Sequence, residues 1–333
     1  MFIKQVEAPI LLALLLSTLY LLYQVTEIMA ARRKINKLAG KNVFITGRCL
    51  STLSESTLSP QHVCGITSVP LTHTIHFLST GASGGLGEAL VDECIRNGAR
   101  SIIISGRNTL ELQRVVDKYQ DSTCKMFMVV MDLTLPLPSN LMEQIHKEMG
   151  DATYYINVLI NNAGAGFRGS FVESTLEVQR QVMEADYWGA VKLTQLFLPA
   201  MLTNRDGTII NIASVQGKLG IAQRTAYSAA KHALVGFFDS LRAEVGGVVH
   251  ILNVLPGYIK TGHSRNAITA EGRQYGKQDE STEGGYSPSS VAGRIVTALA
   301  RSEEEVVIAD VKTRLALFLR YFAPSVLFKK TRK

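Results

Sequence analysis

Cysteine is scarce in this 333-residue chain, and its four cysteines stand far apart, at Cys49, Cys64, Cys94 and Cys124. None of them forms a Cys-x-x-Cys pair. Disulfide frameworks and zinc sites depend on such pairs or on close clusters of ligands. We therefore expect no disulfide scaffold and no metal site, and we expect the chain to work in a reducing compartment.

Acidic residues are missing from two segments that are rich in basic ones. Residues 31–42 contain five Lys and Arg side chains, and residues 311–333 contain seven. The net charge of +7 comes from these flanks, because the residues between them are net negative. The chain has no basic patch of the kind that reads nucleic acid, so we expect no nucleic-acid partner. Basic segments of this kind are typical of a membrane surface, where anionic lipids attract them.

Charged residues are also absent from Ala8–Val25, a run of eighteen residues. As a helix this run spans about 27 Å, close to a hydrocarbon core of ~30 Å. A cleaved signal peptide would have a shorter apolar region and a small-x-small cleavage site, and no good site precedes the basic run. Three basic residues at 32–34 outnumber Lys4, which favours a cytosolic position for the rest of the chain. We predict a single-pass anchor over 1–30 and a basic linker over 31–42.

The segment T-A-Y-S-A-A-K, Thr225 to Lys231, has the features of a proton-transfer site. Tyr227 and Lys231 stand four residues apart and share one face of a helix. A nearby ammonium favours the phenolate, so a pKa of ~10 is lowered toward neutrality. Ser214 ends the apolar run T-I-I-N-I-A-S, where its hydroxyl can meet the same oxygen. We predict that Tyr227 protonates a carbonyl as a hydride arrives.

A glycine-rich loop, T-G-A-S-G-G-L-G, occupies residues 80–87. Gly81 permits a tight turn, Gly85 permits close approach of the backbone to a pyrophosphate, and Gly87 permits close helix packing. The helix expected from Leu86 would offer its N-terminal amides to the phosphates. The loop therefore predicts a site for a dinucleotide.

With N-N-A-G at 161–164, these motifs resemble, in the same order, those of the short-chain dehydrogenase/reductase family from about residue 40 to residue 310. Within the family, Q-G-K-L-G-I-A-Q-R-T-A-Y-S-A-A-K-H-A and F-F-D-S-L-R-A-E-V are most similar to its membrane-anchored member 7B subgroup. The resemblance implies a single doubly wound α/β Rossmann-type domain over 43–310, with about seven parallel strands and helices on both faces. It also implies reversible hydride transfer between a nicotinamide cofactor and a carbonyl or an alcohol.

The resemblance gives each catalytic residue a role. Tyr227 transfers the proton, Lys231 lowers its pKa and holds the ribose, and Ser214 binds the substrate oxygen. Relatives have asparagine where this chain has Asp186, and there the residue holds a water partly through its backbone carbonyl. Aspartate keeps that carbonyl, so the resemblance implies a catalytic role for Asp186 in the proton relay.

The cofactor residues follow from the same motifs. They are Gly81, Ser83, Gly85, Leu86, Gly87, Arg107, Asp132, Leu133, Asn162, Ala163, Gly164, Tyr227, Lys231, Pro256, Gly257 and Thr261. Arg107 stands just after the strand expected at 101–105, where relatives specific for NAD place an acid. An arginine there would bind a 2′-phosphate, so NADP(H) is favoured over NAD(H).

Residues 47–80 interrupt the family pattern. Joining K-N-V-F-I-T at 41–46 directly to Gly81 would restore an unbroken motif, which indicates an insertion such as a retained intron. Only one segment can form the central strand. Residues 43–46 match relatives better, whereas Ile75–Thr80 connects directly to the glycine loop, and we favour the latter on connectivity. A metal role for the three histidines of this insertion is not favoured.

The remaining elements complete the expected sheet and its surroundings. We predict strands at 126–131, 158–161, 250–255 and 306–309, a long helix over 176–202, a mobile substrate lid over 258–286 and a helix at 288–300. The tail 311–333 places five apolar residues on one helical face: Val311, Leu315, Phe318, Leu319 and Phe322. Such a face packs on a core or docks on a membrane or on a second copy in a homodimer.

Membrane attachment favours a small, hydrophobic, lipid-like carbonyl or alcohol as the substrate. The endoplasmic reticulum is the expected membrane, and the peroxisomal membrane is the alternative. A different class of function also fits: a nucleotide-binding or scaffold protein with impaired turnover, because the glycine motif is split and Asp186 replaces asparagine.

Overall fold

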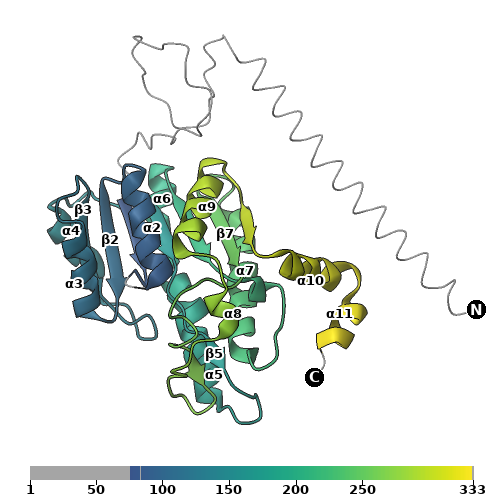
Figure 1. Cartoon of the computed structure of the whole chain (residues 1–333). Coiled ribbons are helices and arrows are strands. Elements are labelled where there is room, and N and C mark those ends of the chain that lie inside the picture. The colour runs from purple at the N-terminus through teal and green to yellow at the C-terminus, as the bar shows by residue number, and fades with distance from the viewer. Residues whose placement is uncertain (1–75, 83, 332–333) are drawn as a thin grey trace, which may run out of the picture. The chain divides into compact units, whose positions relative to one another are not determined.

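A sheet of seven parallel strands forms the centre of the computed structural model, which describes residues 76–82 and 84–331 (Figure 1). The strand order is β3-β2-β1-β4-β6-β7-β9. The strands are β1 (His76–Thr80), β2 (Ser101–Gly106), β3 (Lys125–Val130), β4 (Val158–Asn161), β6 (Thr208–Ile212), β7 (His250–Pro256) and β9 (Glu305–Ile308). Two short strands, β5 (Phe167–Arg168) and β8 (Ile268–Thr269), pair separately beside the main sheet.

Helices cover both faces of the sheet (Figure 1). They are α2 (Gly85–Arg96), α3 (Thr109–Lys118), α4 (Leu141–Met149), α5 (Leu176–Met183), α6 (Gly189–Asn204), α7 (Thr225–Glu244), α8 (Glu280–Glu283), α9 (Pro288–Ala300), α10 (Val311–Phe322) and α11 (Pro324–Thr331). A π-helical turn, η1 (Glu184–Trp188), joins α5 to α6, and a 3-10 turn, η2 (Val215–Gly217), follows β6.

Alternating side chains of each strand build two separate cores. In β2, Ile102 and Ile104 face the layer of α2, α3 and α9, while Ile103 faces the layer that contains Phe197 of α6 and Phe238 of α7. All three isoleucines are buried, because a parallel sheet covered on both faces has no solvent side. The predicted doubly wound Rossmann-type domain is therefore confirmed.

The central strand comes from the second of the two segments that could supply it. β1 (His76–Thr80) pairs in parallel with β2 on one side and β4 on the other. Its last residue continues directly into the glycine loop, so the prediction based on connectivity is correct. Residues 43–46 and the rest of the insertion lie outside the described part of the chain.

The predicted anchor and basic linker also lie outside the described residues. Within 76–82 and 84–331, no helix combines the length and the apolar character needed to cross a bilayer.

A ladder of asparagines crosses the middle of the sheet. Asn161 of β4, Asn211 of β6 and Asn253 of β7 are register partners and all three are buried. The Asn161 side-chain amide donates to Asn211 (2.9 Å), that of Asn211 donates to Asn253 (3.1 Å), and that of Asn253 donates to Asp239 of α7 (2.9 Å). Each amide compensates the desolvation of the next, so the ladder fixes the strand register in an otherwise apolar layer.

Two predicted elements gain detail in the structure. The long helix expected over 176–202 is present, and it contains the π-helical turn η1 at Glu184–Trp188, where the helix widens around the buried Asp186. In the tail, where core packing and surface docking were both open, most of the apolar face is exposed: Val311 is 81% exposed and Leu315 56%, while Leu319 and Leu317 pack against the core. Periodicity located the apolar stripe of α10 but did not show which side of the helix faces the protein.

Candidate active site

A cavity of about 1190 Å³ opens at the carboxyl ends of the parallel strands. The strand order reverses between β1 and β4, and a doubly wound sheet has its ligand crevice at such a switch point. Sixteen of the predicted site residues line this cavity: Gly81, Gly85, Leu86, Gly87, Arg107, Asp132, Leu133, Asn162, Ala163, Gly164, Ser214, Tyr227, Lys231, Pro256, Gly257 and Thr261. Asp186 lies behind Gly164, and Ser83 is outside the described residues.

The glycine loop has the backbone geometry that a dinucleotide requires. Gly81 has a φ of +62°, and its carbonyl accepts a hydrogen bond from the Gly84 amide at 3.1 Å. A methyl group on Gly87 would overlap the Gly81 carbonyl and lie 2.7 Å from Ala82 Cα. A methyl group on Gly85 would lie 2.9 Å from Thr261 Cγ2. The loop and the start of α2 thus leave room, and free amides, for a pyrophosphate.

The catalytic side chains come from two elements that meet under the cavity. Helix α7 carries Tyr227 and Lys231, and the Lys231 ammonium lies 5.6 Å from the centre of the Tyr227 ring. Ser214 follows β6, and its hydroxyl accepts a hydrogen bond from the Gln216 amide at 3.1 Å. Lys231 Nζ donates to the carbonyl of Ile212, the last residue of β6, at 3.1 Å. The end of β6 thus fixes both Ser214 and Lys231.

Asp186 contacts the same lysine directly. Its Oδ1 lies 2.9 Å from Lys231 Nζ, and its Oδ2 accepts a hydrogen bond from the Ala165 amide at 2.8 Å. The two side chains are only 0% and 4% exposed. A methyl group on Gly164 would lie 2.5 Å from Asp186 Oδ1, so a glycine is needed here for the ion pair to form. The sequence placed Asp186 near Lys231 through its backbone and missed the ion pair of its side chain.

Burial and charge oppose each other within this group. Burial raises the pKa of Asp186, and the Lys231 charge does not fully reverse this effect. Burial alone would lower the pKa of Lys231, but the charge of Asp186 and the Tyr227 phenol outweigh it and leave that pKa raised. The lysine therefore stays protonated.

The pKa of Tyr227 differs from the prediction. Burial raises the pKa of Tyr227, Lys231 lowers it, and Asp186 raises it again, so its pKa stands above the ordinary value. We expected the ammonium to bring this pKa down toward neutrality. That expectation was wrong for the protein alone, because burial is the largest effect and Asp186 cancels part of the lysine's charge.

Comparison with known proteins identifies this arrangement. Residues 76–272, more than half of the chain, match the model of the family described as short chain dehydrogenase. The chain belongs to the short-chain dehydrogenase/reductase family. It is 40% identical over 261 residues to dehydrogenase/reductase SDR family member 7B of Bos taurus, covering 75% of this chain and 78% of that one. It is 38% identical over 262 residues to the SDR family protein 7-like of Drosophila melanogaster, covering 75% and 77%. The expected likeness to the member 7B subgroup is confirmed.

Solved structures share the fold. A short-chain dehydrogenase from Streptomyces avermitilis superposes with a TM-score of 0.65 at 26% identity, covering 78% of this chain and 96% of that one. A short-chain dehydrogenase from Burkholderia cenocepacia in complex with NADP superposes with a TM-score of 0.61 at 25% identity, covering 78% and 98%. As a short-chain dehydrogenase/reductase, the protein is an NAD(P)-dependent oxidoreductase.

The adenosine end of this dehydrogenase/reductase site carries a positive and a negative side chain. Arg107, 75% exposed at its side chain, lies 3.9 Å from the Asp132 carboxylate. Burial opposes ionisation of Asp132, but hydrogen bonds from Thr134 and the charge of Arg107 together lower its pKa. Both side chains line the cavity.

Two residues of the substrate end were missed by the motif analysis. The His263 ring lies 5.9 Å from that of Tyr227, centre to centre, and lines the cavity. Desolvation by the surrounding protein, helped by the charges of Lys231 and Arg168, lowers the pKa of His263, although the residue itself is exposed at the cavity. Arg168 of β5 pairs with Asp279 at 2.7 Å. His263 follows Thr261 by two residues and could have been noticed; nothing in the sequence marks Arg168.

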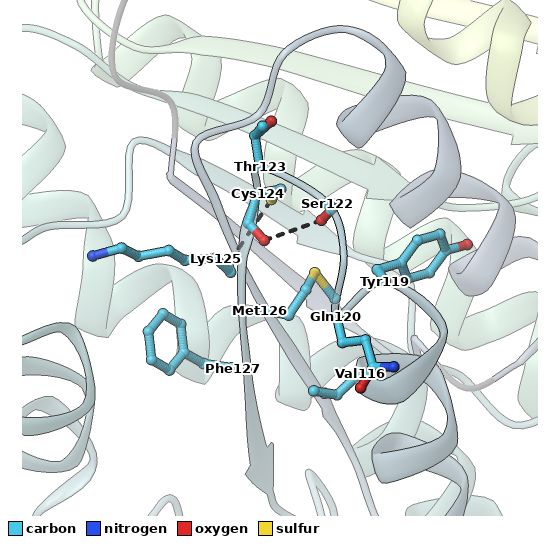
Figure 2. Close-up of a pocket in the computed structure, with 9 residues that line it drawn as sticks. All are labelled: Val116, Tyr119, Gln120, Ser122, Thr123, Cys124, Lys125, Met126 and Phe127. Atoms are coloured by element: carbon cyan, nitrogen blue, oxygen red, sulfur yellow. Dashed lines mark hydrogen bonds between the residues drawn. The ribbon is translucent and has the colours of Figure 1, made fainter.

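A second, smaller hollow lies at the edge strand β3 (Figure 2). It has a volume of about 340 Å³ and is lined by nine residues of the α3–β3 region, among them Tyr119, Cys124 and Met126. These residues do not include Ser214, Tyr227 or Lys231, so the chemistry of the family belongs to the larger cavity.

Proposed function

We propose that the protein interconverts a carbonyl and an alcohol on a hydrophobic, lipid-like substrate with NADP(H) as the cofactor. The observation that carries this proposal is the meeting of Ser214, Tyr227 and Lys231 in the cavity that the glycine loop also lines. The shape of the loop supports a dinucleotide at one end, and the three side chains support proton transfer at the other.

The cofactor, when bound, supplies or accepts the hydride. In reduction, Tyr227 donates its phenolic proton to the substrate oxygen, and Ser214 donates a hydrogen bond that steadies the developing negative charge. The Lys231 ammonium stabilises the resulting phenolate through space and binds the ribose. In oxidation the proton moves from the alcohol to the Tyr227 phenolate.

Asp186 acts in this proposal as a positioning residue. Its carboxylate holds Lys231 against β6 and cancels part of the ammonium's field at Tyr227. The tyrosine therefore keeps its proton to higher pH than it would beside an unpaired lysine, which favours proton donation over proton removal.

The decisive experiment measures NADPH oxidation by the full chain with a panel of lipid aldehydes and ketones. Tyr227→Phe should lower turnover by about a hundredfold to ten-thousandfold, the range of a general acid. NADPH affinity, measured by protein fluorescence, should stay near that of the unchanged protein. Substantial turnover by a folded Tyr227→Phe variant contradicts the assignment.

The same measurement tests the alternative, a nucleotide-binding protein with impaired turnover. The observation that favours it is the Asp186–Lys231 ion pair, which weakens the charge that usually activates the tyrosine. NADPH binding without reduction of any carbonyl in the panel, together with turnover restored in Asp186→Asn, would support this alternative.

The preference for NADP(H) rests on Arg107, whose exposed guanidinium stands beside the adenosine end of the cavity. Arg107→Ala should weaken NADPH binding by about tenfold, the loss expected for one charged hydrogen bond, and leave NADH binding unchanged. Arg100→Ala, a change in the loop before β2, serves as the control. Equal affinity of the unchanged protein for NADH and NADPH would refute the preference.

We also propose a single-pass anchor over 1–30 with the enzyme in the cytosol, on the endoplasmic reticulum or on the peroxisomal membrane. The uncharged run and the basic residues after it support this location. Retention in membranes washed with alkaline carbonate tests the anchor, and protease digestion of intact vesicles tests the orientation. A homodimer is a further proposal, tested by crosslinking of the full chain.

A further inference from the structure

The last two helices leave an unusual surface. Along α10, Val311, Leu315, Phe318 and Phe322 follow one another at helical spacing and form a single stripe, which we call the tail stripe. Val311 is 81% exposed, Leu315 56% and Phe322 58%, and the rings of Phe318 and Phe322 lie 4.6 Å apart. On α11, Val326 and Phe328 are exposed as well.

The orientation of the tail stripe is fixed by the fold. Leu317 of α10 and Leu327 of α11 are buried in a small core with Val215, Leu219 and Ala309. Asp310 accepts a hydrogen bond from the Thr313 amide at 2.8 Å and caps the start of α10. Arg314 donates to the carbonyl of Val307 at 2.6 Å, which attaches the helix to β9. The helix pair is thus held with its apolar stripe outward.

The basic residues of the tail indicate which kind of partner covers the tail stripe. Residues 311–333 contain seven basic side chains and no acidic one, and Lys312, Lys329 and Lys330 are exposed beside the apolar residues. Two copies docked through this surface would bring basic residues against basic residues, which is unfavourable. An anionic lipid surface supplies both an apolar layer and the opposite charge.

We propose that α10 and α11 form a second membrane contact, in which the tail stripe enters the headgroup region of an anionic bilayer. The cavity supports this placement, because Lys312, Ala316 and Leu327 line it together with Tyr227. Docking of the tail therefore brings the cavity wall to the lipid surface. This contact is independent of the proposed N-terminal anchor and of the proposed chemistry.

The test uses the full chain in vesicles, with a polarity-sensitive dye on a cysteine at Leu315→Cys. Cys49 and Cys64 are replaced by serine; Cys94 and Cys124 are buried, and burial raises the pKa of Cys124 to about 11, so neither competes for the dye. Leu110→Cys is the control, since Leu110 is also exposed, 81% against 56% for Leu315, but lies on α3, beside the opposite edge of the sheet.

We expect the emission of the dye at 315 to shift to the blue in vesicles of phosphatidylcholine with phosphatidylserine, and much less in phosphatidylcholine alone. The dye at 110 should not shift in either. Replacing Lys329 and Lys330 with glutamine should lower the ratio of docked to undocked tails by roughly 25-fold, from about fivefold per basic residue near an anionic surface.

Three results would overturn the proposal. The first is no shift at 315 in either kind of vesicle. The second is a shift of equal size with and without phosphatidylserine. The third is a shift that grows with the density of protein in the vesicles, because that dependence identifies a second copy as the partner.

Discussion

The two ends of the active-site cavity are built in different ways. The cofactor end is mostly backbone: a turn at Gly81, close packing at Gly87 and the amides that begin α2. The chemical end is made of side chains, and its central pair, Asp186 and Lys231, joins a π-helical turn to a helix forty-five residues later in the chain. Backbone geometry depends on short motifs, whereas a side-chain ion pair depends on how distant elements pack.

The two ends of the cavity should also be sensitive to different kinds of substitution. The cofactor end has space that only glycine can leave open, so any added side-chain atom should weaken cofactor binding. The chemical end holds two opposite charges away from water, so removing either partner leaves the other charge buried and unpaired. Changes at the two ends are therefore expected to alter different measured quantities.

Of the three further changes that test this comparison, Gly87→Ala should have the largest effect. The added methyl group would overlap the Gly81 carbonyl and lie 2.7 Å from Ala82 Cα, which forces the loop out of shape. We expect a loss of about 3 kcal/mol in NADPH binding, roughly a hundredfold, measured by titration calorimetry.

Gly236→Ala is the matched control, because a methyl group there meets no atom within 4 Å. It should leave NADPH affinity unchanged. If Gly87→Ala binds NADPH as tightly as the unchanged protein does, the backbone geometry of the glycine loop does not determine cofactor binding.

A smaller effect is expected from a change in the asparagine ladder of the sheet. Asn211→Ala removes the acceptor of Asn161 and the donor to Asn253, and it leaves both groups buried. We expect the free energy of unfolding to fall by about 2 kcal/mol, measured by urea denaturation. Asn204→Ala, on the exposed end of α6, should cost far less. Equal costs for the two variants would show that the ladder does not stabilise the sheet.

The smallest of the three effects should come from Asp186→Asn, and it concerns pH. Asp186 raises the pKa of Tyr227 by neutralising Lys231, so removing its charge lowers that pKa. Reduction requires the protonated phenol, and its loss of rate at alkaline pH should therefore begin at lower pH in the variant than in the unchanged protein. Oxidation requires the phenolate, so the rise in its rate with pH should begin at a lower pH in the variant than in the unchanged protein.

The measurement is the pH profile of kcat in both directions. Glu184→Gln, in the same π-helical turn but partnered with Lys192 at 3.3 Å, is the control and should leave the profile in place. An unchanged profile in Asp186→Asn would mean that the ion pair does not set the proton affinity of Tyr227.

The sequence by itself determined the fold class and most of the site. Strands at 101–105 and 158–161 and the helix at 288–300 were correctly placed, because short continuous apolar runs and a proline at the start of a helix are local signals. The glycine loop and the Tyr227–Lys231 pair are local in the same sense: each depends on residues within a few positions of one another.

Only the tertiary structure decided the electrostatics and the exposed face. The pKa of Tyr227 depends on its burial and on Asp186, forty-one residues away, and neither is visible in a seven-residue motif. The asparagine ladder exists because three distant strands share one register. The stripe on α10 has a helical period whether it faces the core or solvent, and the packing of Leu317 decided that it faces outward. Periodicity fixes which residues lie together on a helix, while the neighbours against which the helix packs fix the direction in which they point.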